Sequence, residues 1–124
     1  MVNQQQAQAI VDQYLSSLET GDLEGVMALY ADNARVEDPV GSEPLQGRAA
    51  LTEFYNKAVA MVVAARSQGP VRTVANELVF AFEIESEYDG QRLAIEIIDH
   101  FVLNDDDKII GMRAFWSDAN MRPA

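Results

Sequence analysis

The sequence ELVFAFEIESEYDGQRLAIEIIDHFVL, residues 77–103, predicts two long antiparallel strands that meet at a tight turn. In residues 77–88, apolar side chains alternate with glutamates, so one face of the strand is apolar and the other is acidic. The apolar face consists of Leu78, Phe80, Phe82 and Ile84. Asp89-Gly90 is a strong signal for a two-residue hairpin turn. The second strand follows directly.

Asp99 interrupts the apolar face of this second predicted strand. By alternation it shares that face with Ile95, Ile97 and Phe101. Burying an ionised carboxylate costs several kcal/mol. The side chain therefore has three ways to avoid this cost: it can pair with a cation, bind a metal or take up a proton.

The sequence offers Asp99 few cations on the matching face. In the last predicted strand, residues 108–116, Arg113 alternates with Ile109, Gly111 and Phe115, and the other face carries Met112, Ala114 and Trp116. If that other face lines the same interior as Asp99, Arg113 points away from it. Protonation is then the least costly state, because desolvation raises a carboxyl pKa by about 3–5 units at full burial. A neutral carboxylic acid is a hydrogen-bond donor.

The first half of the chain predicts helices. Apolar residues recur at helical spacing in three segments. The stripes are Ala7, Ile10, Val11, Tyr14, Leu15 and Leu18; Leu23, Val26, Met27 and Tyr30; and Leu51, Phe54, Tyr55, Ala58, Val59 and Val62. Residues 34–39 and 71–76 are candidates for short strands. Helices followed by an antiparallel meander indicate an α+β fold, in which a curved sheet around the helices would enclose a cone-shaped pocket.

Composition narrows the class of protein. A length of 124 residues fits one domain, 1–124. The net charge of −11 argues against nucleic acid and anionic membrane surfaces as partners. There is no cysteine, and one histidine, His100, cannot build a multi-histidine metal site. No signal peptide or membrane-spanning run is evident, so we expect a soluble, cytoplasmic protein.

Three further polar residues accompany Asp99 on apolar stripes: Tyr14, Tyr55 and Asp38. A tyrosine on such a stripe is often an ordinary core residue, and Asp38 before Pro39 fits a turn. Glu37 takes the opposite face, where we expect solvent. The functional interpretation is that an acid and a phenol form an oxyanion hole while a second carboxylate acts as a base. Proton abstraction beside a carbonyl suits this set and requires no metal or cofactor.

Three short motifs carry a resemblance to a known family. They are VEDPVG at residues 36–41, EFY at 53–55 and IDHF at 98–101, within longer similar stretches at 13–41, 47–55 and 97–116. The chain resembles the bacterial ketosteroid isomerases of the nuclear-transport-factor-2-like (NTF2-like), or SnoaL-like, superfamily from about Val11 to about Asn120. The resemblance implies a cone-shaped NTF2-like fold, with three N-terminal helices on a curved, mixed but mainly antiparallel sheet around an apolar pocket.

The resemblance also implies catalytic roles. Asp38 is similar to the general base that moves a proton between C4 and C6 of a steroid. Tyr14 and Asp99 are similar to the two donors to the C3 oxygen. A protonated aspartate in this role is an established feature of ketosteroid isomerases, so the resemblance supplies that assignment. The apolar stripe by itself already disfavours an ionised Asp99.

Further residues would contact the substrate. Tyr55 and Tyr30 match positions that support the phenol of Tyr14, and the Trp116 indole could donate to Asp38. The cavity walls implied by the resemblance are Phe54, Phe82, Ile84, Met112 and Ala114; each of these could equally be an ordinary core residue. The likeness is loose at residues 61–72, which leaves substrate preference open.

The implied activity is conversion of Δ5-3-ketosteroids to conjugated Δ4-3-ketosteroids without a cofactor, by a homodimer formed through the outer face of the sheet. A second hypothesis is a polyketide cyclase or dehydratase type of enzyme on the same fold. A third is a non-catalytic binding module, against which Asp99 counts, because such a module needs no acid on an inner stripe.

Overall fold

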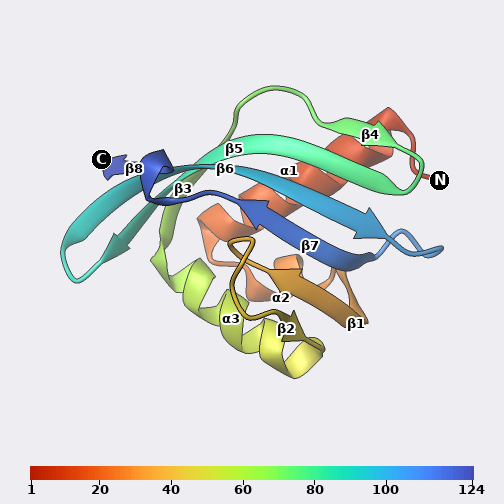
Figure 1. The fold of residues 1–124 in the computed structure, drawn as a ribbon, viewed down its shortest axis with the longest axis horizontal. Helices are drawn as coiled ribbons and strands as arrows, with labels where there is room; N and C mark the ends of the chain where they lie inside the picture. The colour runs from red at the N-terminus through yellow and green to blue at the C-terminus, as the bar shows by residue number, and fades with distance from the viewer.

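The computed structural model describes all residues, 1–124. Three helices, α1 (Gln4–Thr20), α2 (Leu23–Met27) and α3 (Arg48–Met61), lie against one sheet. Figure 1 shows β5, β6 and β7 running side by side, with α1 on the far side of them and α3 beside β1 and β2. No helix is long and apolar enough to cross a membrane.

The sheet has eight strands. Their bounds are β1 (Tyr30–Glu37), β2 (Leu45–Gln46), β3 (Val62–Ser67), β4 (Arg72–Val74), β5 (Glu77–Tyr88), β6 (Gln91–Leu103), β7 (Ile109–Phe115) and β8 (Met121–Pro123), with a 3-10 turn at Asp118–Asn120. The main order is β2-β1-β7-β6-β5-β3, while β4 pairs with β5 and β8 with β6. Only β1 and β7 run parallel. The predicted α+β fold with a mixed, mainly antiparallel sheet is confirmed.

Local sequence signals explain where α1 begins and ends. Asn3 caps its first turn by accepting from the Gln6 amide, and the Gln6 side chain accepts from the Asn3 amide. Gly21 ends the helix in a left-handed conformation, φ 73°, which glycine adopts without strain. The apolar stripe of α1 is buried, and the helix packs against β3.

The β5–β6 hairpin forms as predicted. The strands pair from Glu77 opposite Val102 to Tyr88 opposite Gln91, around Asp89-Gly90. The inner face of β5 is buried, and Phe80 lies directly opposite Asp99. This register brings the acid of β6 into the aromatic core.

Three details of the sequence-based prediction were wrong. The second helix stops at Met27, and Tyr30 begins β1 instead, opposite Ile109. Ile109 is buried rather than on the side of Arg113, because the β6–β7 register shifts between Val102 and Leu103 and reverses the alternation. Strands β2, β3 and β8 were not predicted.

Candidate active site

A pocket in two adjoining chambers lies between the helices and the inner face of the sheet. The inner chamber is about 60 Å³ and is lined by Tyr14, Leu18, Asp38, Phe54, Tyr55, Ala58, Val62, Phe82, Ile84, Ile97 and Asp99. The outer chamber is about 360 Å³ and is lined by Asp38, Phe54, Lys57, Ala58, Met61, Val62, Ile84, Ser86, Ile95, Ile97 and Trp116. Six residues are common to both, so the two chambers form one tapering space.

Asp99 lies at the inner end of this space and is 1% exposed. Neither carboxyl oxygen has a hydrogen-bond partner in the protein. Burial raises the pKa of Asp99 well above its ordinary value, the charge of Asp38 raises it further, and the Tyr14 hydroxyl opposes both effects. Burial therefore favours the neutral form of this carboxyl group, which can donate a hydrogen bond into the chamber.

Three buried tyrosines form a chain of hydroxyl groups beside Asp99. The Tyr14 and Tyr55 hydroxyl oxygens are 3.0 Å apart, and those of Tyr55 and Tyr30 are 2.5 Å apart. Burial raises the pKa of all three phenols well above the ordinary value, so they stay protonated. If Tyr30 donates to Tyr55 and Tyr55 to Tyr14, the Tyr14 proton is free to point into the inner chamber.

Aromatic rings surround Tyr14 beside the inner chamber. The Tyr14 ring meets Phe80, Phe82 and Phe101 edge to face, with ring centroids 6.1, 6.4 and 5.2 Å away. This arrangement is favourable for aromatic pairs and surrounds the Tyr14 ring with apolar groups. Hydrogen bonds made inside such a space are stronger than in water.

Asp38 occupies a different environment. It follows the last residue of β1, lines both chambers and is half-buried. Its Oδ1 accepts a hydrogen bond of 2.8 Å from the Trp116 indole. Burial raises the pKa of Asp38, and the Trp116 bond lowers it. The pocket therefore holds two unlike carboxyl groups. Asp99 is fully buried without a hydrogen-bond partner, and Asp38 is half-buried and accepts from the Trp116 indole.

The other predicted site residues divide into two groups. Trp116, Phe54, Phe82, Ile84 and Tyr55 line the chambers. Tyr30, Met112 and Ala114 are buried in the surrounding core and are not among the lining residues.

Two polar lining residues were missed. Ser86 continues the inward alternation of Ile84 along β5, and Lys57 lies three residues after Phe54 on α3. The alternation along β5 and the helical spacing along α3 were the sequence signals that could have identified these two residues.

Two polar residues next to the site face away from it. His100 Nε2 is 2.6 Å from Glu77 Oε1 on the outer face. Glu37 was expected in solvent, but its carboxylate binds Arg113 and the Gly41 amide. No group of three or more histidine, aspartate or glutamate side chains is arranged to hold a metal ion.

Comparisons with known proteins identify the family of the chain. Residues 11–112 match the model of the SnoaL-like domain family. A curated steroid delta-isomerase from Nocardioides simplex is 36% identical over 116 residues, which cover 94% of each chain.

Two further similarities point to a different chemistry. The epoxide hydrolase LasB from Streptomyces lasalocidi is 49% identical over 39 residues, covering 32% of this chain and 14% of LasB. A solved structure of SalBIII, an epoxide hydrolase/cyclase-like enzyme with a role in pyran ring formation in the polyether salinomycin, superposes with a TM-score of 0.90 at 27% identity over the whole of both chains. The chain thus belongs to the SnoaL-like family, as a ketosteroid-isomerase-like enzyme of the NTF2-like superfamily.

Proposed function

We propose that the protein isomerises Δ5-3-ketosteroids to their conjugated Δ4 isomers. The observation that carries this proposal is the inner end of the pocket, where Asp99 has no partner and stands beside the Tyr14–Tyr55–Tyr30 hydroxyl chain. A carbonyl oxygen at that end would receive two hydrogen bonds, one from Tyr14 and one from Asp99. The identity to a steroid delta-isomerase over nearly the whole chain supports the same substrate class.

In the proposed reaction, the Asp38 carboxylate removes a proton from C4 of the steroid. The electron pair of the C–H bond moves into the C3 carbonyl, which becomes a dienolate oxygen held by Tyr14 and Asp99. The protonated Asp38 then returns the proton to C6, and the C5–C6 double bond moves to C4–C5. Asp38 is regenerated as a carboxylate, so protons and electrons balance without a cofactor.

Typical rate factors for a general base and for oxyanion donors fit the roles proposed for Asp38, Tyr14 and Asp99. A placed general base typically contributes about 10²–10⁴-fold, and one oxyanion donor about 10²–10³-fold. Asp38 is a weak base for a carbon acid, so the donors at the inner end must stabilise the enolate. The outer chamber, about 360 Å³, lies within the size range of small-molecule sites and would take the remainder of the steroid.

The test is to mix the protein with a Δ5-3-ketosteroid and follow the ultraviolet absorbance of the conjugated enone. The proposal predicts a rate far above that of the uncatalysed reaction and proportional to protein concentration. A rate equal to the uncatalysed one would reject it.

A second candidate is epoxide opening or cyclisation, favoured by the likeness to SalBIII over the whole chain. In this reaction Asp38 would take a proton from a hydroxyl group or from water. The oxygen of that hydroxyl group or water would attack an epoxide carbon. The epoxide C–O bond would break, and Asp99 would give its proton to the departing oxygen. Loss of the new proton from Asp38 to solvent and uptake of one by Asp99 would restore both groups. Two unlike carboxyl groups suit this reaction as well.

The two candidates are separated by offering both substrates to the same preparation. Turnover of an epoxy-alcohol to a cyclic ether, with no change in the steroid, would assign the second function. The isomerase proposal predicts the reverse.

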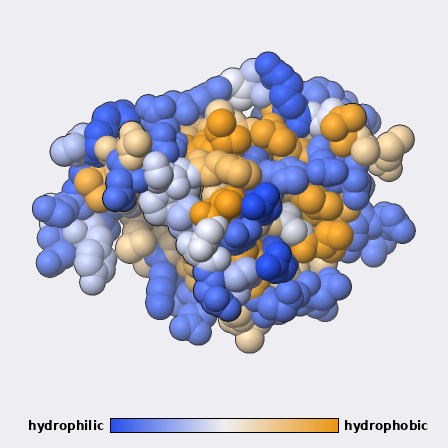
Figure 2. Space-filling view, viewed as in Figure 1, coloured by the Kyte–Doolittle hydropathy of each residue, from blue (hydrophilic) through white to orange (hydrophobic).

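We also propose a homodimer formed through the outer face of the sheet. Figure 2 shows groups of hydrophobic side chains over the central strands, with hydrophilic side chains between and around them. On this face Val79, Ile98 and Phe115, from β5, β6 and β7, are each more than two-fifths exposed. Exposed apolar side chains on three neighbouring strands are a feature that interfaces often have. Sedimentation should give twice the chain mass for wild type and a smaller mass for Ile98→Glu; a monomeric wild type would contradict the dimer.

A further inference from the structure

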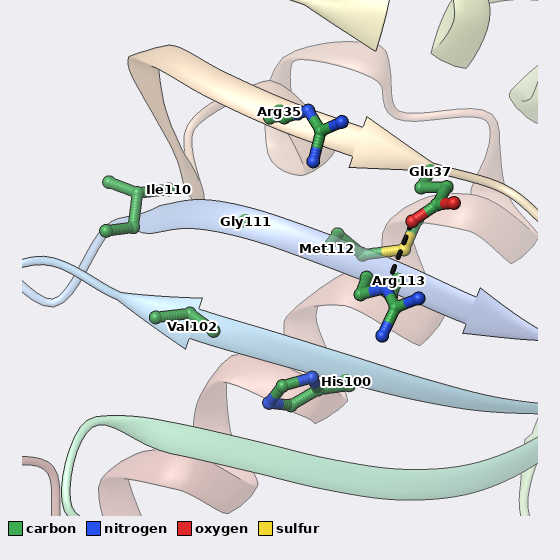
Figure 3. Close-up of a pocket in the computed structure, with 8 residues that line it drawn as sticks. All are labelled: Arg35, Glu37, His100, Val102, Ile110, Gly111, Met112 and Arg113. Atoms are coloured by element: carbon green, nitrogen blue, oxygen red, sulfur yellow. Dashed lines mark hydrogen bonds and ion pairs between the residues drawn. The ribbon is translucent and has the colours of Figure 1, made fainter. Parts of the chain in front are cut away.

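Glu37 precedes the proposed base directly, yet its side chain lies on the opposite face of the sheet. Its Oε1 accepts a hydrogen bond of 3.0 Å from Arg113 Nε on the neighbouring strand β7, as Figure 3 shows. Its Oε2 accepts one of 2.9 Å from the Gly41 amide. Both oxygens are therefore engaged, and the side chain is only 17% exposed.

These bonds hold the loop that carries Asp38. The loop leaves β1 after Glu37, and Gly41 takes a φ of 100°, which few other residues tolerate. Glu37 joins the start of the loop to Gly41. The Val40 amide donates to the Ala114 carbonyl of β7 at 2.8 Å, and Glu37 itself pairs with Arg113 in the β1–β7 register. The loop is thus fastened to β7 from both ends.

Asp38 has one hydrogen bond of its own, from the Trp116 indole, and Trp116 follows the last residue of β7. The position of the Asp38 carboxylate relative to its donor depends on how the loop docks on that strand. A displacement of the loop would move the base away from the indole and from the substrate carbon together.

We propose that Glu37 is a positioning residue for Asp38: its carboxylate clamps residues 38–41 onto β7 and so fixes the base against Trp116 in the pocket. Two other interpretations are open to test. The first is an ordinary surface ion pair with Arg113, which contributes little. The second is an electrostatic effect, in which the negative charge of Glu37 acts on Asp38 through space.

The first measurement does not depend on the activity. Trp116 is the only tryptophan, so its indole N–H gives a single, unambiguous NMR signal. In wild type this proton should show the shift and the protection from solvent exchange of a hydrogen-bonded group. Glu37→Ala should move the signal towards that of free indole and speed its exchange by about 10-fold or more, since each 1.4 kcal/mol is tenfold. An unchanged signal would overturn the proposal.

Glu85→Ala is the matched control. Glu85 is also an outer-face glutamate, 21% exposed, and its carboxylate binds Arg66 at 2.7 Å. It lies on β5, away from the Asp38 loop. The variant makes the same change of charge and should leave the Trp116 signal as in wild type. A response equal to that of Glu37→Ala would overturn the proposal, because the effect would then be general.

The second measurement is kinetic and rests on the proposed isomerase function. Glu37→Ala should lower kcat by about 10–100-fold with KM changed less than about threefold, since small misplacements of catalytic groups carry such losses. Glu37→Gln should recover most of the loss, because its amide oxygen can still accept from Gly41. Equal losses in both variants would assign an electrostatic role and overturn the clamp. If wild type does not turn over the steroid, the proposed function fails, while the indole signal still decides the role of Glu37.

Discussion

Asp99 and Glu83 are both largely shielded from water on the same sheet, but they lie on opposite faces and their pKa values are shifted in opposite directions. Glu83 is 7% exposed on the outer face, where Arg66 and Arg122 bind its two oxygens at 2.5 and 2.7 Å. These bonds, from Arg66 first, lower the pKa of Glu83. Asp99 is 1% exposed on the inner face without any partner, and burial raises its pKa.

The direction of the pKa shift of a shielded carboxyl group therefore depends on its neighbours as well as on its exposed fraction. Glu83 is covered by two arginines whose own side chains are half open to water. The two arginines therefore compensate the charge of Glu83, and they are themselves in contact with solvent. Asp99 lies among rings and aliphatic groups, and only the Tyr14 hydroxyl opposes the effect of burial on its pKa. We therefore expect Glu83 to be an ionised partner of its arginines, and we propose Asp99 as a proton donor in the pocket.

We expect the greatest loss of activity from a substitution on the inner face of the sheet, and almost none from one on the outer face. Asp38→Asn should lower kcat by at least about 10²–10⁴-fold, because an amide cannot take the proton. Steroid binding should persist. Glu83→Gln should keep kcat near wild type. Enone absorbance and equilibrium binding of a product steroid check both variants, and an active Asp38→Asn enzyme would remove Asp38 from the role of base.

The next effect asks whether Asp99 acts as a donor. Asp99→Leu should lower kcat by about 10²–10³-fold, the loss typical of one oxyanion donor. Asp99→Asn should lose less, because an amide still donates a hydrogen bond. The comparison uses kcat at saturating steroid. A leucine variant more active than the asparagine variant would show that Asp99 serves packing alone.

A smaller effect concerns the pH dependence of turnover. Asp38 must be ionised to accept a proton, and burial raises its pKa above the ordinary value of 3.8. Activity should therefore fall as the pH drops through a midpoint above 3.8. The measurement is kcat/KM of wild type across the acid range. A midpoint at or below the ordinary aspartate value would mean that burial does not govern Asp38.

A still smaller effect is expected in the free energy of unfolding, which should change with pH in opposite directions for Asp99 and Glu83. Between the unfolded and the folded pKa of Asp99, the folded state holds a proton that the unfolded state has lost. Wild type should therefore lose stability relative to Asp99→Asn as the pH rises, by at most about 1.4 kcal/mol per pH unit. The pKa of Glu83 is lowered, so its stabilisation is lost as the pH falls through the folded value. Relative to Glu83→Gln, wild type should gain stability with rising pH, and urea unfolding at several pH values measures both differences. Slopes of the same sign would contradict the comparison.

Much of this arrangement was predictable from the sequence, because it follows from alternation. The period of two in β5 and β6 and the Asp89-Gly90 turn fix their register, and that register puts Asp99 on the inner face. Helical spacing likewise identified the buried stripes of α1 and α3. Local patterns of this kind are set by which side of an element must be buried.

What failed depended on contacts between distant segments. The reversal at Ile109 comes from a register shift against β6, which no pattern within β7 contains. Glu37 was expected in solvent, but Arg113, 76 residues away, binds it. The short strand β3 follows α3 without a break, so its first residue, Val62, also continued the helical stripe. Such features become visible only when the sheet is assembled.

The central claim is that Asp99 keeps its proton at neutral pH. The direct measurement is the ¹³C chemical shift of the Asp99 carboxyl carbon in labelled, unliganded protein, assigned by its absence in Asp99→Asn and followed through a pH titration. The structure predicts the shift of a protonated carboxyl group throughout the neutral range, while Glu83 gives that of a carboxylate. A carboxylate shift for Asp99 at neutral pH would contradict the account.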